Sequence, residues 1–106
     1  MERHRTGEPT YRVDTAPRCI GQLAKIPKNI RKLILDRIED LGFEPKPHGV
    51  EPLHGSDKGL FRIRQGDYRI VYNIQDQRLL VLVVRVVHRK EVYKKKHSRN
   101  HAHRSI

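Results

Sequence analysis

An alternating stretch in the second half of the chain limits its possible folds more than any other feature. Phe61 and Ile63 alternate with Arg62 and Arg64, which is the period of a strand with one apolar and one charged face. Such a strand packs its apolar face on a core. Its charged face is left for solvent or for a ligand.

The residues that follow predict a β-hairpin and then a third strand. Gly66, within a polar turn at 65–67, accepts a positive φ without a Cβ clash. Residues 68–74 alternate again, with Tyr and Ile on one side and Arg69 on the other. Residues 79–87 are apolar on both faces except for Arg85, which favours a central strand over an edge strand.

Two short helices are predicted before these strands. Thr15 is a candidate N-cap and Pro17 suits the first turn of the first helix. Its expected core residues share one helical face: Ile20, Leu23 and Ala24. The second helix begins near Lys28, and Gly42 is placed where a C-cap glycine belongs. Its apolar stripe recurs at helical spacing and consists of Ile30, Leu33, Ile34, Ile38 and Leu41.

This order of elements predicts an α+β fold, in which a helical hairpin covers one face of a small sheet. Residues 1–9 are expected to form a flexible leader and residues 10–96 a single domain. A short helix is expected around residues 90–96. The basic tail at 97–106 has almost nothing to bury and is predicted to be disordered.

Charge suggests the class of partner. The chain carries 23 Lys and Arg against 12 Asp and Glu, a net charge of +11. Such an excess indicates an anionic partner, which is a nucleic acid, an acidic protein or a membrane surface. No apolar run is long enough to span a bilayer and no secretory signal is visible, so we expect a cytoplasmic protein without a membrane role. The single cysteine, Cys19, fits a reducing compartment.

Four arginines are the sharpest functional signal. Strand parity places Arg62 and Arg64 on one face, and the hairpin brings Arg69 near them, while Arg89 follows the last strand. Like charges this close repel one another unless an anion is held between them, and guanidinium groups bind phosphate with a planar fork. The alternative is a solvated sheet face. His88 and Tyr93 beside the cluster favour RNA binding or a phosphoryl reaction.

Basic residues after the last strand have weaker interpretations. The lysines of this region form a solvated face or contact RNA phosphates: Lys90, Lys94, Lys95 and Lys96. His97, His101 and His103 have metal-ligand spacing, but a polar tail lacks the fixed scaffold that metal sites need. We therefore predict no metal and no cofactor.

The chain resembles the RelE/ParE superfamily of bacterial toxin–antitoxin systems from about Tyr11 to Tyr93. The motifs that carry the resemblance are Pro52-Leu53-His54-Gly55, the run from Gly59 to Tyr72, and His88-Arg89-Lys90-Glu91-Val92-Tyr93. The resemblance implies the RelE-like fold, a helical hairpin on a mainly antiparallel sheet with a short C-terminal helix. It also implies a cognate RelB-like antitoxin, with DNA contacted only through that antitoxin.

Function divides within the superfamily. RelE-like members are ribosome-dependent endoribonucleases that cut mRNA in the A site and so inhibit translation. They do so by attack of a ribose 2′-OH on the adjacent phosphate. ParE-like members inhibit DNA gyrase and are not nucleases. The resemblance places the RelE-type catalytic positions on Arg62, Arg64, Arg69, Arg89 and Tyr93, which favours an endoribonuclease, with the gyrase inhibitor as the alternative.

One departure from the family affects the proton acceptor. Some members have lysines at the positions of Arg62 and Arg64, and lysine can lose its proton whereas arginine effectively cannot. The arginines are therefore assigned to phosphate binding and to transition-state charge. Tyr93 is predicted to stack on a base and mediate proton transfer, and His88 is the alternative acid or base. The identity of the general base stays open at this point.

Overall fold

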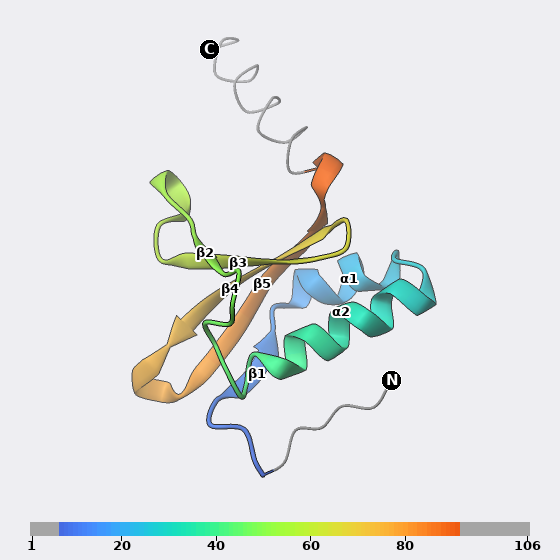
Figure 1. The fold of residues 1–106 in the computed structure, drawn as a ribbon. Helices are drawn as coiled ribbons and strands as arrows, with labels where there is room; N and C mark the ends of the chain where they lie inside the picture. The colour runs from blue at the N-terminus through green and yellow to red at the C-terminus, as the bar shows by residue number, and fades with distance from the viewer. Residues whose placement is uncertain (1–6, 92–106) are drawn as a thin grey trace.

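The computed structural model describes residues 7–91 of the protein (Figure 1). In chain order the elements are β1 (Arg12–Thr15), α1 (Pro17–Ala24), α2 (Lys28–Asp40), β2 (Glu51–Pro52), the 3-10 turn η1 (Gly55–Asp57), β3 (Leu60–Gln65), β4 (Tyr68–Gln75), the 3-10 turn η2 (Asp76–Arg78) and β5 (Leu80–His88). Residues 89–91 are helical, and the rest of the predicted C-terminal helix lies outside the described residues. The same is true of most of the predicted leader and of the whole predicted tail.

The strands form one sheet in the order β1-β5-β4-β3-β2. The predicted hairpin is confirmed as β3 and β4, which join through a tight turn where Gly66 has a φ of 60°. β5 lies between β4 and β1, so the central strand is confirmed as well. β1 runs parallel to β5 and the other pairings are antiparallel. The α+β fold class and the mainly antiparallel sheet are therefore confirmed.

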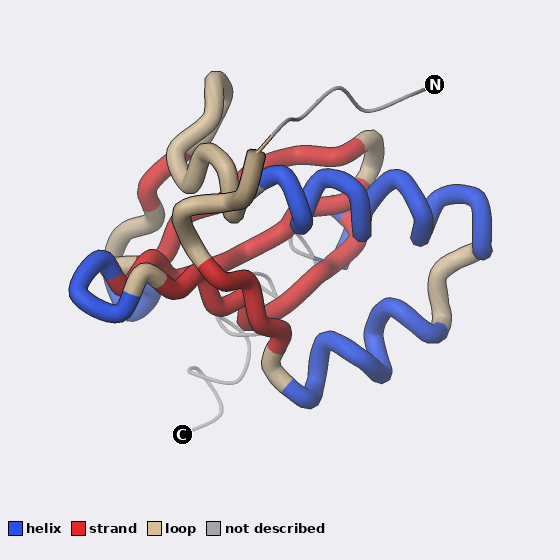
Figure 2. Tube along the Cα trace, turned by 90° about the horizontal axis from the view of Figure 1, so that it is seen from below, coloured by secondary structure: helices blue, strands red, loops and turns tan. Residues whose placement is uncertain are grey.

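Both helices cover the same face of the sheet, as Figures 1 and 2 show from two directions. The core lies between these layers. The helical hairpin contributes Cys19, Leu23, Ile26, Ile34, Ile38 and Leu41, and the sheet contributes Ile63, Ile70, Tyr72, Val81, Val83 and Val86. Neither α1 nor α2 packs on the other face of the sheet. No helix among these residues has both the length and the apolar character needed to cross a bilayer.

The first helix meets the core with a different face from the predicted one. Thr15 ends β1 instead of capping α1, and Ala16 takes the N-cap position. Cys19 and Leu23 are buried, whereas Ile20 is 63% exposed and Ala24 is also exposed. The prediction for α1 was confirmed for Leu23 and wrong for Ile20 and Ala24, because a helix of two turns is too short for its apolar period to be unambiguous. In α2 the stripe is confirmed except at Leu33, which is exposed.

Gly42 is needed for a close contact and not for the predicted C-cap. Leu41 is the C-cap of α2, and Gly42 is absent from the positive-φ residues. The backbone N–H of Tyr11 donates to the carbonyl oxygen of Gly42 at 3.0 Å. A Cβ on Gly42 would lie 2.8 Å from the carbonyl oxygen of Tyr11 and 3.2 Å from a methyl carbon of Val13. This glycine therefore allows the chain entering β1 to pack against the end of α2.

We expect Gly42→Ala to lower the free energy of unfolding by about 1–3 kcal/mol, since the added methyl group overpacks a backbone contact. Gly21→Ala in α1 is the matched control, because a Cβ there has no atom within 4 Å. The control should raise the free energy of unfolding by about 0.5–1 kcal/mol through helix propensity. Urea unfolding measures both changes. Equal effects of the two substitutions would contradict the close contact.

Candidate nucleic-acid interface

The sheet face turned away from the helices, here called the open face, carries the arginines of the hairpin. Directly paired residues of antiparallel strands point to the same side of a sheet. Arg64 pairs with Arg69, and Arg62 pairs with Val71. Their neighbours along the strands, Ile63 and Ile70, are buried against the helices. The predicted convergence of Arg62, Arg64 and Arg69 on one face is therefore what the strand register shows.

Arg89 joins these three residues at the end of the sheet where β3 turns into β4. Its backbone N–H donates to the carbonyl oxygen of Asp67 at 2.7 Å, and its Nε lies 3.9 Å from Oδ1 of the same residue. Burial, and then the positive charges of Arg64, Arg62 and Arg89, lower the pKa of Arg69 below its ordinary value. The charges of the other three arginines therefore reach the guanidinium group of Arg69. We call Arg62, Arg64, Arg69 and Arg89 the arginine cluster.

Glu51 places a carboxylate beside the arginine cluster, and sequence reasoning missed it. β2 pairs with β3 so that Glu51 lies directly opposite Arg62. Arg62 donates from Nε to Oε1 of Glu51 at 3.1 Å and also from Nη2 to the same oxygen. Hydrogen bonding to Arg62, and then the charges of Arg62, Arg64 and Arg69, lower the pKa of Glu51 below its ordinary value. The carboxylate is therefore ionised at neutral pH.

The charges of the cluster are only partly balanced. Glu51 pairs with Arg62 and Asp67 lies near Arg89, whereas Arg64 and Arg69 form no ion pair with any residue in the range 7–91. Arg64 is exposed and Arg69 is half-buried. A polyanion that lies along the open face would supply the missing negative charge. The arrangement is suited to binding phosphate groups.

A β-bulge adds a fifth arginine to the open face. Val71 pairs with Arg85 but the next residue, Tyr72, pairs with Val83, so β5 contains one extra residue at this point. The extra residue reverses the alternation, because Val81 and Val83 on one side of it and Val86 on the other all reach the core. Arg85 is thereby turned to the same face as Arg62. Sequence parity alone did not assign it to the site.

His88 lies apart from the arginines. It pairs with Tyr68, whose neighbour Arg69 pairs with Val87, so His88 has the parity of the helix-covered face. The ring of His88 makes an edge contact with Tyr68 at a centroid distance of 5.1 Å, and its Nδ1 accepts from the backbone N–H of Lys90 at 3.1 Å. Lys90 is exposed just after β5. The remaining predicted site residues are outside the described part of the chain: Tyr93, Lys94, Lys95 and Lys96.

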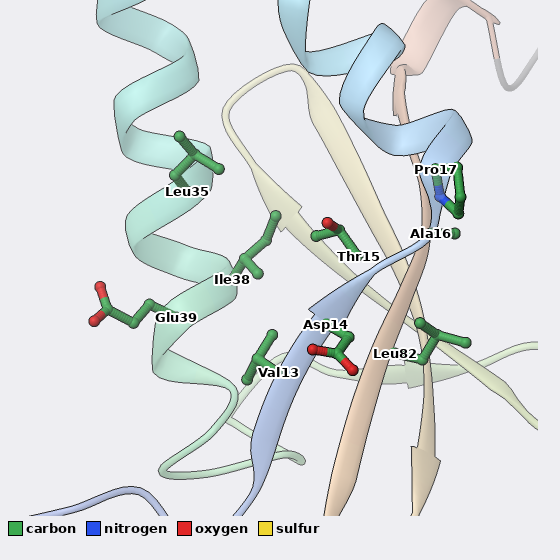
Figure 3. Close-up of a pocket in the computed structure, with 9 residues that line it drawn as sticks. All are labelled: Val13, Asp14, Thr15, Ala16, Pro17, Leu35, Ile38, Glu39 and Leu82. Carbon is green, nitrogen blue, oxygen red and sulfur yellow. The ribbon is translucent and has the colours of Figure 1, made fainter.

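A groove at the opposite edge of the sheet contains none of the predicted site residues. It lies between α2 and β1, as Figure 3 shows, and its walls include Val13, Thr15, Leu35 and Ile38. Its lining combines apolar side chains with the carboxylates of Asp14 and Glu39. No group of three or more potential metal ligands occurs within residues 7–91. The concentration of charge on the open face is therefore the feature of the described chain that is suited to phosphate chemistry.

Comparison with known proteins identifies the family. Residues 13–93 match the family model described as the ParE toxin of the type II toxin–antitoxin system parDE. The protein named Toxin RelG from Mycobacterium tuberculosis is 34% identical over 87 residues, which is 81% of this chain and 97% of that protein. The residues that the family model matches include the arginine cluster.

Solved structures agree with this result. The toxin–antitoxin complex RelBE2 from Mycobacterium tuberculosis contains a chain with a TM-score of 0.70 and 30% identity, covering 77% of this chain and 94% of its own. The RelE–RelB complex from Pyrococcus horikoshii has a TM-score of 0.67 and 28% identity, covering 76% and 96%. The isolated RelE toxin of E. coli, 24% identical with a TM-score of 0.63, shares the fold over 84% of this chain and 97% of its own. The superfamily indicated by the sequence motifs is confirmed, and the chain belongs to the ParE toxin family of type II toxin–antitoxin systems, within the RelE/ParE superfamily.

Proposed function

We propose that this toxin is a ribosome-dependent endoribonuclease that cleaves mRNA in the A site by attack of a ribose 2′-OH on the adjacent phosphate. The observation that supports the proposal is the arginine cluster, in which Arg62, Arg64 and Arg69 share the open face and the charge of Arg89 reaches Arg69 from the end of β5. Phosphoryl transfer places extra negative charge on the phosphate oxygens, and preorganised cations stabilise that charge. Arginine is suited to this task because it stays protonated and donates through a planar fork.

Glu51 supplies the proton acceptor that the arginines cannot provide. Both hydrogen bonds from Arg62 go to Oε1, so Oε2 is left to accept a proton from a 2′-OH. In this scheme the 2′-oxygen bonds to phosphorus while its proton passes to Glu51. The bond from phosphorus to the 5′-oxygen breaks, and the leaving oxygen takes a proton from solvent. The products are a 2′,3′-cyclic phosphate and a free 5′-OH, and Glu51 then releases its proton to solvent.

Residues outside this scheme keep their predicted roles as part of the proposal. Tyr93 stacks on a base beside the scissile phosphate, and the lysines contact the RNA backbone: Lys90, Lys94, Lys95 and Lys96. His88 is the weaker candidate for proton transfer, because its register turns it away from Arg69. Translation in the cytoplasm is the process that such a nuclease inhibits.

A second candidate function is inhibition of DNA gyrase without RNA cleavage. The description of the matching family model favours it, since that model represents ParE toxins. A gyrase inhibitor has no need of a carboxylate held among arginines on one sheet face. For this reason the nuclease is the function that the geometry supports better.

The proposal includes a cognate antitoxin of the RelB type. The solved relatives from Mycobacterium tuberculosis and Pyrococcus horikoshii are toxin–antitoxin complexes. A toxin with a net charge of +11 is complementary to an acidic antitoxin segment that folds as it binds. In this scheme DNA is contacted by the antitoxin and not by the toxin.

Purified toxin added to ribosomes stalled on a defined mRNA tests the proposed function. Primer extension should map cuts within the A-site codon, with little cleavage of the same mRNA when ribosomes are omitted. A parallel reaction contains gyrase and supercoiled plasmid. Intact mRNA together with gyrase-dependent DNA breaks would replace the nuclease by the second candidate.

A further inference from the structure

Arg85 stands one step beyond the arginine cluster on the open face. It is paired with Val71, and Arg62 lies directly across that residue on the other neighbouring strand. Arg69 is the diagonal neighbour of Arg85, and such neighbours have Cα atoms about 7–8 Å apart. Consecutive phosphates of a single strand can span this separation. The bulge in β5 therefore extends the row of guanidinium groups away from the turn between β3 and β4.

The guanidinium group of Arg85 is held by one ion pair and keeps further hydrogen-bond donors. Its Nη2 donates to Oδ2 of Asp57 at 3.1 Å. Asp57 belongs to η1, in the segment that joins β2 to β3. The Nε and Nη1 of Arg85 make no hydrogen bond with any residue of the range 7–91. The side chain of Arg85 is 20% exposed and that of Asp57 is 36% exposed, so solvent reaches the pair. The fork retains donors for a second anion.

We propose that Arg85 forms a second phosphate subsite, which binds a phosphodiester next to the scissile one in the mRNA. In the free protein Asp57 orients the side chain of Arg85. When the phosphate binds, it displaces Asp57 or shares the guanidinium group with it. The inference rests on the proposed function, since it places the scissile phosphate at the arginine cluster. It adds a positioning contact that fixes which nucleotide lies over Glu51.

A purely structural role of the ion pair makes a different prediction. If Arg85 and Asp57 only tie the segment containing η1 to the sheet, then removing either charge should weaken RNA binding alike. If Arg85 binds phosphate, Asp57 is a competitor for it. Removing the acid then preserves or strengthens RNA binding, and removing the arginine weakens it.

Binding of a short single-stranded oligoribonucleotide at several salt concentrations separates the two roles. We expect Arg85→Gln to reduce affinity by about tenfold. It should also lower the slope of log K against log salt by about 0.7, the value for one lost phosphate contact on a single strand. Asp57→Asn should bind at least as tightly as the parent. Arg78→Gln is the matched control, because Arg78 is an exposed arginine in η2 at the other end of β4. Weaker binding by both Asp57→Asn and Arg85→Gln, or an unchanged slope for Arg85→Gln, overturns the subsite.

Cleavage on the ribosome then tests the position of the subsite. A neutral methylphosphonate replaces the phosphate on the 5′ or the 3′ side of the mapped cut. At one of these positions the methylphosphonate should lower the cleavage rate of the parent about tenfold. It should cause no further loss in Arg85→Gln, because the methylphosphonate and the substitution remove the same contact. If the rate losses caused by Arg85→Gln and by the methylphosphonate multiply at both positions, the subsite is overturned and the proposed nuclease function is retained. Absence of cleavage by the parent overturns the proposed function instead.

Discussion

Replacing Glu51 with glutamine should lower the single-turnover rate of mRNA cleavage on the ribosome by about 10²- to 10⁴-fold, the range for loss of a general base. Glutamine keeps the size of the side chain and an oxygen that accepts from Arg62, but it cannot take a proton. Binding of the toxin to programmed ribosomes should change little. The rate is measured with toxin in excess over stalled ribosomes, so that product release does not enter.

Chemical rescue separates proton transfer from the ion pair with Arg62. Imidazole is neutral above its pKa, so it can accept a proton without restoring negative charge beside Arg62. We expect imidazole to raise the cleavage rate of Glu51→Ala, and the rescued rate should increase with pH up to about pH 7, where the imidazole ring loses its proton. The cleavage rate of the parent should show no such increase with pH, because the pKa of Glu51 is lowered by Arg62 and its neighbours. A Glu51→Gln variant as fast as the parent would remove Glu51 from the mechanism.

Arg69→Ala is expected to reduce the same rate by about 10²- to 10³-fold, the usual cost of deleting one preorganised donor to a transition-state anion. Arg69 is central in the cluster, since it pairs with Arg64 and is affected by the charges of Arg62 and Arg89. Expression in growing cells gives a second measurement, because the variant should no longer arrest growth.

The control for Arg69→Ala is Arg78→Ala, which removes the same charge from an exposed turn. Urea unfolding of both variants shows whether the domain remains folded. The charges of Arg62, Arg64 and Arg89 repel that of Arg69. Removing Arg69 relieves this repulsion, so we do not expect the free energy of unfolding to fall. Retained growth arrest by a folded Arg69→Ala variant would contradict the assignment of the cluster to the active site.

Local patterns predicted those elements whose register is set by nearby residues. The alternation around Arg62 and Arg64, with a glycine at position 66, was sufficient for the hairpin because a two-residue turn fixes which residues pair. The apolar residues of β5 indicated a central strand, and β5 lies between β4 and β1 in the sheet. The convergence of three arginines followed from the hairpin alone, since Arg62, Arg64 and Arg69 all lie on β3 and β4.

Features that depend on contacts between distant segments could not be read in the same way. Glu51 lies in a stretch rich in proline and glycine, where no periodicity shows that it pairs with Arg62. Arg85 has the parity of the core in a regular strand, and only the bulge opposite Val71 and Tyr72 turns it to the open face. His88 was grouped with Arg89 by proximity in the chain, although its pairing with Tyr68 places it on the other face. In each case the deciding partner is more than ten residues away.

A single 2′-deoxy substitution in the mRNA, at the nucleotide on the 5′ side of the mapped cut, tests the central claim most directly. In the proposed reaction the nucleophile is a ribose 2′-OH of the mRNA itself, which reacts at the arginine cluster. Removing that one hydroxyl should therefore leave the mRNA intact on programmed ribosomes. The unsubstituted mRNA should be cut in the same assay. Cleavage of the deoxy-substituted mRNA at the same position and rate would contradict the account.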